Sequence, residues 1–257
     1  MLDPLKGFVA SVQDFFVLTG RAIRNIFRSP HYADDIFMQM DVIGVGSLMI
    51  AGMTGFFGGA VMALQMSKAL ATYGQVSKTG TLVSLTLVRE LGPVLTGIMV
   101  AGRNASGIAS ELGSMTVTEQ IDAMRALGTD PVRKLVAPRL VALLVTLPLL
   151  TLIADAIGIG GGWVVSTQFF GINSSSFMAA VWDGLSTDDI IGGFVKTLAF
   201  ALIIGTIACH KGLSTEGGTV GVGRSTTSAV VVTSILIIVA DYFLTRALQL
   251  VWGLPTS

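Results

Sequence analysis

Among the charged side chains inside long apolar stretches of this sequence, where a charge needs a physical reason to be present, six are candidates for a functional site. They have both signs and are spread over four stretches: Arg89, Glu90, Arg103, Asp155, Lys196 and Asp241. A charge in the middle of a bilayer costs about 2.5–3.5 kcal/mol on insertion scales, so it normally faces protein or water. Two interpretations follow. The charges pair and hold a helix bundle together, or they form a polar patch in a cavity.

A second pattern lies in the connection 111–139, between two apolar stretches. Thr116 and Glu119 have the spacing of a capping box, in which a hydroxyl and a carboxylate each bind a free backbone amide. Apolar residues then recur at helical intervals, and Gly128 and Pro131 can end the helix. The pattern predicts a short amphipathic helix over about 117–127. It either packs on its own protein or docks into a partner through apolar anchors.

A third pattern nearly matches a phosphate-binding loop. It places Gly218 and Gly223 before Arg224 and Ser225, but the motif requires lysine at the arginine position and a preceding strand. We therefore expect the glycines to form a tight connection before the last helix. With only two histidines and one cysteine in the chain, no credible Ser/His/Asp, Cys/His or multi-histidine metal set exists.

Composition identifies the class of protein. The chain is 52% hydrophobic and 12% charged, with a mean hydropathy of +0.76, whereas soluble domains carry about 25% charged residues. About 20 apolar residues suffice to cross the bilayer core. Five stretches meet this length: about 42–67, 82–108, 140–166, 190–210 and 226–250. The sequence predicts an all-α integral membrane protein, with residues 1–257 forming a single membrane domain. Its zero formal net charge gives no indication of a nucleic-acid partner.

Two further features concern the helices themselves. Residues 4–28 alternate apolar and basic positions at helical spacing, which predicts an amphipathic helix in the membrane interface that ends at Ser29-Pro30. Small residues four apart, which allow helices to approach closely, occur as Gly55 with Gly59 and as Gly158 with Gly162. These pairs indicate close packing without naming a partner.

Orientation follows from the distribution of Lys and Arg in the connections. With the N-terminus in the cytoplasm, inside segments hold ten basic residues and outside segments hold Lys68 and Lys78. We therefore expect a cytoplasmic N-terminus and, with five spans, a C-terminus on the opposite side.

Two segments of the sequence resemble a known family. They are 89–142, which begins RELGPVLTGIMVAGRN and includes EQIDAM, GTDP and PR, and 211–231, KGLSTEGGTVGVGRSTTSAVV. They resemble the MlaE (YrbE-like) permeases of bacterial ABC lipid transporters and their chloroplast relatives, and the resemblance covers about 35–250. The GTDP–PR spacing and the EQIDAM helix are not general membrane-protein patterns.

The resemblance implies an assembly. Two copies of the permease would form the translocation path in the bacterial inner membrane, and two cytoplasmic ABC ATPase subunits would bind ATP and Mg, leaving this chain without a cofactor. A periplasmic MCE-domain lipid-binding protein and a small STAS-like accessory subunit are further expected partners. The ATPase would engage a coupling helix, here Glu119, Gln120, Ile121, Asp122, Ala123, Met124 and Leu127.

The resemblance also implies a role for the intramembrane charges. It favours Arg89, Glu90, Lys196 and Asp241 as residues of a lipid cavity or gate, with Arg103 and Asp155 as further candidates. The expected function is movement of phospholipids between the inner membrane and the outer envelope, which maintains the lipid asymmetry of the outer membrane.

Two alternatives from other classes stay open. A secondary transporter would use Asp155, Glu90 and Asp241 as proton carriers and work without an ATPase. A membrane-embedded enzyme acting on lipid would need a nucleophile or a metal set, and the sequence offers neither.

Overall fold

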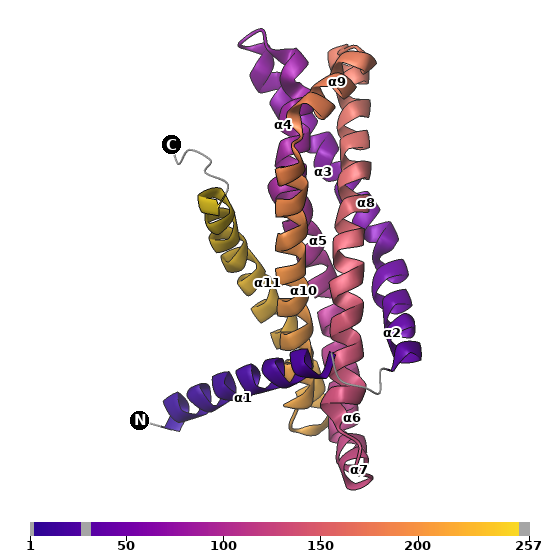
Figure 1. The fold of residues 1–257 in the computed structure, drawn as a ribbon, viewed down its shortest axis with the longest axis vertical. Helices are drawn as coiled ribbons and strands as arrows, with labels where there is room; N and C mark the ends of the chain where they lie inside the picture. The colour runs from indigo at the N-terminus through magenta and orange to yellow at the C-terminus, as the bar shows by residue number, and fades with distance from the viewer. Residues whose placement is uncertain (1–2, 27–31, 252–257) are drawn as a thin grey trace. The chain divides into compact units, whose positions relative to one another are not determined.

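The computed structural model describes residues 3–26 and 32–251, with side chains described for 13–25 and 32–251. Every element in these ranges is a helix. Five helical stretches are long and apolar enough to cross a membrane: Ala33–Ala71, Val76–Val117, Val132–Phe170, Thr187–Leu213 and Gly218–Val251 (Figure 1). The prediction of an all-α membrane protein with about five spans is therefore confirmed. Each predicted span lies within one of these stretches, and each stretch extends beyond it.

Several spans combine α-helix with short π-helical segments, which are often found at functional sites. The first contains α2 (Ala33–Met40), η1 (Asp41–Val45) and α3 (Gly46–Ala71). The second contains the 3₁₀ turn η2 (Val76–Lys78), then α4 (Thr79–Thr86), η3 (Leu87–Leu91), α5 (Gly92–Val100), η4 (Ala101–Ala105) and α6 (Ser106–Val117). The third consists of η5 (Val132–Val136) and α8 (Ala137–Phe170), and the last two are α10 (Thr187–Leu213) and α11 (Gly218–Val251).

Three shorter helices complete the described chain. They are α1 (Asp3–Ile26), α7 (Gln120–Ala126) and α9 (Ser174–Gly184). A helix thus occupies most of the segment in which the N-terminal amphipathic helix is predicted, but its place in the membrane interface stays a prediction. The predicted end at Ser29-Pro30 lies outside the described residues.

The helices divide between two compact units, which we describe separately. The first comprises residues 1–45, 100–146 and 201–236, and the second comprises 46–99, 147–200 and 237–257. The interpretation of 1–257 as a single domain stays a prediction.

In the second unit, glycines allow α3 and α8 to pack backbone against backbone. A Cβ atom on Gly55 would lie 2.2 Å from the carbonyl oxygen of Ala154, and one on Gly59 would lie 1.8 Å from that of Gly158. No side chain fits into such a gap. The two small-residue motifs noted in the sequence are therefore partners of each other, because Gly55 and Gly59 face the helix that carries Gly158.

The second unit also contains α9, in a segment between the third and fourth spans. It packs against α4, where the Thr81 hydroxyl donates to the carbonyl oxygen of Ala180 at 2.7 Å (Figure 1). A Cβ atom on Gly80 would lie 2.5 Å from the carbonyl oxygen of Phe177, so this contact is also close.

The first unit contains the connection between α6 and η5. There Arg139, which is 3% exposed, pairs with Glu111 at 2.7 Å, and Lys134 pairs with Asp35. These contacts join the end of the second span and the start of the third to one another and to α2.

Two predictions about helix ends are wrong. Thr116 and Glu119 do not form a capping box: the Thr116 hydroxyl donates to the carbonyl of Leu112 within α6, and Glu119 makes no side-chain cap. Because α6 continues to Val117 and Glu119 adopts a left-handed backbone with φ 59°, α7 begins only at Gln120.

The glycine-rich connection is also shorter than predicted. Positive φ values occur at Gly217 and Gly218, and α11 begins at Gly218, so Gly223 and Arg224 lie within the helix. The turn itself is thus confined to the first glycines of the run.

Candidate functional site

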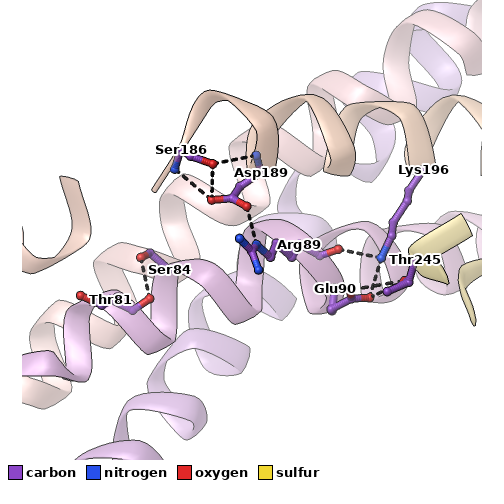
Figure 2. A network of polar contacts seen from close by, with 8 residues as sticks. All are labelled: Thr81, Ser84, Arg89, Glu90, Ser186, Asp189, Lys196 and Thr245. Atoms are coloured by element: carbon purple, nitrogen blue, oxygen red, sulfur yellow. Dashed lines mark hydrogen bonds and ion pairs between the residues drawn. The ribbon is translucent and has the colours of Figure 1, made fainter. Parts of the chain in front are cut away.

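A buried cation, Lys196 of α10, is the centre of a polar cluster within the spans. Its side chain is 2% exposed. The Nζ atom contacts Glu90 Oε2 at 2.5 Å and donates to the carbonyl oxygen of Arg89 at 2.8 Å (Figure 2). It also contacts Asp241 Oδ1 at 3.1 Å. One side chain thereby joins η3, α10 and α11 within the second unit.

The backbone carbonyl of Arg89 can accept a hydrogen bond from Lys196 because a proline follows four residues later. In an α-helix the amide of residue 93 would donate to it, but Pro93 has no amide hydrogen. An unsatisfied backbone carbonyl is costly in an apolar span. The π-helical segment η3 and the Lys196 ammonium group together compensate for the missing helical hydrogen bond. The proline and the buried lysine are therefore structurally linked.

The Arg89 side chain extends away from Lys196 and pairs with Asp189 of α10 (Figure 2). Asp189 is 5% exposed, and its second carboxylate oxygen accepts from the Ser186 amide at 2.9 Å and from the Ser186 hydroxyl at 2.8 Å. The Asp189 amide in turn donates to the Ser186 hydroxyl at 3.3 Å. This is a capping box at the start of α10, and its carboxylate also holds the guanidinium group.

A hydroxyl and a small hollow complete the cluster. The Thr245 hydroxyl of α11 donates to Glu90 Oε2 at 3.2 Å. Beside these groups lies a hollow of about 60 Å³, also lined by Gly192, Gly193, Leu248 and Gln249. Such a volume accommodates a few water molecules or a small polar group, not an acyl chain.

Four of the six charges predicted as site residues are brought together: Arg89, Glu90, Lys196 and Asp241. Pairing, the first of the two interpretations, is therefore observed for this set, while a role in transport stays a prediction. Arg103 lies on η4 in the first unit with an exposed side chain, so it is not part of the cluster.

Asp155 of α8 lies in a separate site in the second unit. It is 6% exposed, and its Oδ1 atom has no hydrogen-bond partner among the described residues. A Cβ atom on Gly92 would lie 1.8 Å from this oxygen, so the carboxyl group occupies the space that a side chain on α5 would take. Asp155 borders a hollow of about 10 Å³, distinct from the one beside Lys196.

Sequence reasoning missed Asp189, Ser186 and Thr245. The first two could have been found, because Ser186 and Asp189 have capping-box spacing immediately before an apolar stretch. Thr245 has no such signal, since its contact with Glu90 joins residues that are far apart in the sequence.

The second predicted site, the coupling helix, is the short helix α7 in the first unit. The apolar residues of this predicted site do not share one environment: Ile121 is 3% exposed, Met124 is half-buried, and Leu127, which directly follows α7, is 84% exposed. Ile121 therefore packs on its own protein, whereas Leu127 is free to meet a partner. Arg125 and Asp122, which lie between Ile121 and Leu127 in the sequence, form an exposed ion pair at 2.7 Å.

Comparison with known proteins decides the family. Residues 36–247 match the family model described as Permease MlaE. The chain belongs to the MlaE permease family. As an MlaE permease it is the membrane permease of an ABC transporter, and the resemblance noted on 89–142 and 211–231 is confirmed.

Three relatives of this MlaE permease match about nine tenths of its length. A probable ABC transporter permease protein of Rickettsia felis is 44% identical over 93% of this chain and 92% of its own length. A probable ABC transporter permease protein of Synechocystis is 39% identical over 89% of this chain and 87% of its own. The intermembrane phospholipid transport system permease protein MlaE of Haemophilus influenzae is 35% identical over 91% of this chain and 93% of its own.

Proposed function

We propose that this MlaE permease moves phospholipid across or out of the bacterial inner membrane, driven by ATP hydrolysis on a separate ATPase. The observation that carries the proposal is the Lys196 cluster, which places paired charges inside spans of an ABC permease. The name of the Haemophilus relative, a phospholipid transport permease, supports the substrate class.

The exposure of the cluster suits a headgroup. Its inner members are buried, with Lys196 2% and Asp189 5% exposed, whereas Arg89 is 41% and Glu90 39% exposed. The buried members hold the exposed ones in place. A guanidinium group in this position can bind a phosphate through two parallel hydrogen bonds. A headgroup phosphate would then exchange with Asp189 at Arg89 while the lipid passes.

The proposed assembly follows from the family. Two copies of the chain form the path, and the cytoplasmic ATPase subunits engage α7 through Leu127. A periplasmic MCE-domain protein receives or delivers lipid, and a STAS-like subunit accompanies the ATPase. The N-terminus is cytoplasmic, and ATP and Mg bind only to the partner.

Reconstitution tests this function. The chain, alone or with its ATPase, is placed in vesicles that contain a headgroup-labelled phospholipid, and transfer to an acceptor lipid-binding protein is measured. We expect transfer only with the ATPase and ATP. Transfer by the chain alone, driven by a proton gradient, would contradict the proposal and favour the secondary transporter.

The coupling helix provides a second readout in the same experiment. Leu127→Ser removes the exposed apolar anchor, so we expect lipid-stimulated ATP hydrolysis to fall about tenfold, the effect of losing ~1.4 kcal/mol at an interface. Tyr73→Ser is the matched control, because Tyr73 is 78% exposed in the connection between the first two spans. Equal hydrolysis by both variants would reject α7 as the docking element.

A further inference from the structure

The first unit contains a polar hollow that is separate from the Lys196 cluster. It has a volume of about 540 Å³ and is bordered by α1, the end of α10 and the start of α11. Ligand pockets commonly have volumes of about 300–1,000 Å³, so this hollow is large enough for a polar headgroup.

Four charged side chains surround the hollow. Two are cations, Lys211 and Arg224, and two are carboxylates, Asp14 and Glu216. Within the described part of the chain, none of the four forms an ion pair. The formal charges cancel, yet the opposite charges remain apart. The hollow therefore offers separate positive and negative groups to a ligand that carries both signs.

Three serines add hydrogen-bonding capacity. Neighbouring threonine hydroxyls donate to backbone carbonyls four residues earlier in the chain, as at Thr215, Thr226 and Thr227. The serine hydroxyls at the hollow make no such bond to any residue that the structure describes: Ser214, Ser225 and Ser228. These hydroxyls are available to a bound phosphate.

The position of the hollow indicates which class of ligand it can bind. Lys211 and Arg224 lie on either side of the connection between the fourth and fifth spans, where basic pockets bind lipid headgroups. We propose that the hollow binds the headgroup of a zwitterionic aminophospholipid, with its phosphate at Lys211 and Arg224 and its primary amine at Asp14 and Glu216. Among the described residues that line it, His210 is the one aromatic ring, so a quaternary ammonium group lacks the cage of several rings that such groups prefer.

Binding can be tested without transport. The purified full chain in detergent is titrated by native mass spectrometry with dihexanoyl phosphatidylethanolamine, phosphatidylcholine, phosphatidylglycerol and inorganic phosphate. We expect phosphatidylethanolamine to bind about tenfold more tightly than the other three, the effect of one charged hydrogen bond.

Paired variants separate the two halves of the site. Lys211→Gln with Arg224→Gln should weaken binding of both phosphatidylethanolamine and phosphatidylglycerol by about tenfold or more. Asp14→Asn with Glu216→Gln should weaken only phosphatidylethanolamine. Lys68→Gln with Lys78→Gln removes two cations elsewhere and should change neither. The single substitutions Lys211→Gln and Glu216→Gln replace any double variant that does not fold.

Three results would overturn the proposal. The first is unchanged phosphatidylethanolamine binding when the two carboxylates are neutralised. The second is phosphatidylglycerol binding at least as tightly as phosphatidylethanolamine, which would indicate an anion site. The third is inorganic phosphate binding as tightly as the lipid, which would indicate a free phosphate ligand. None of these measurements uses ATP or transfer, so they do not depend on the proposed transport function.

Discussion

Lys196 shows how a charge can be kept inside a span. A lone ammonium group there would cost several kcal/mol, but two carboxylates and a backbone carbonyl surround this one. Removing one member of such a set leaves the others buried and unpaired, which is usually more damaging than the pair is stabilising. The cluster is therefore a set whose members depend on one another.

Asp189 and Asp188 allow a matched test of this dependence. Asp189→Asn keeps the shape of the capping box but leaves Arg89 without its carboxylate, so we expect a loss of about 1–3 kcal/mol in the free energy of unfolding. Asp188 is exposed, and Asp188→Asn should stay within about 0.5 kcal/mol of the parent. Denaturant titration of the purified protein in mixed micelles measures both values. Equal losses from the two variants would mean that the contact with Arg89 does not stabilise the fold.

Residue types were predictable here, and their partners were not. A charge inside an apolar stretch is visible in the sequence. The grouping of Arg89, Glu90, Lys196 and Asp241 came only from the resemblance to the family, which did not say which of them pair. Asp155 belonged to the same class by sequence but occupies its own site beside Gly92. Which helix face meets which neighbour depends on tertiary packing, and one sequence does not encode it locally.

At the scale of the element, the contact between α3 and α8 depends on the absence of side chains. Apolar side chains gain little from meeting each other in lipid, so helices associate mainly through close backbone approach. Gly55 and Gly59 provide this on α3, with Ala154 and Gly158 opposite. The face of α3 that contacts α8 therefore does not tolerate larger side chains at Gly55 and Gly59.

Adjacent glycines on α3 test that claim. Gly59→Ala would place a Cβ atom 1.8 Å from a carbonyl oxygen of α8. The helices must then move apart, and we expect a loss of about 1–3 kcal/mol of stability. Gly58→Ala is the control, because its Cβ atom would lie 3.6 Å from Leu95 Cδ1, an ordinary contact, and alanine favours helix. The unfolding free energy in mixed micelles is the measurement, and a Gly59 variant as stable as its Gly58 counterpart would refute the packing.

Element number was predictable and element ends were not. Length and hydropathy identified all five spans, because few structures other than a helix bury about 20 apolar residues in a bilayer. The helices extend past the ends of the predicted spans. Hydropathy marks only the apolar residues, whereas the polar residues at both ends also form backbone hydrogen bonds and so continue the helix. The sequence pattern also did not predict which apolar residue at α7 is buried. Helical spacing marks Ile121 and Leu127 alike, while only Leu127 is exposed.

At the scale of the whole molecule, the basic residues predict an orientation. Ten Lys and Arg residues occur in the segments predicted to be cytoplasmic and two in those predicted to lie outside. The bias acts during insertion, through positive charges in short connections. The proposed coupling through α7 depends on this orientation, because α7 must face the cytoplasmic ATPase.

Labelling of an introduced cysteine tests the orientation directly. The one cysteine of the chain, Cys209, is buried, so the parent protein provides the unlabelled control. Leu127 and Trp182 are 84% and 74% exposed, and they lie in successive connections that must be on opposite sides of the membrane. With a membrane-impermeant maleimide on intact spheroplasts, we expect Trp182→Cys to be labelled and Leu127→Cys to react only after permeabilisation. The reverse pattern would place α7 outside the cell, beyond the reach of any cytoplasmic ATPase, and transport could not then be coupled through this helix.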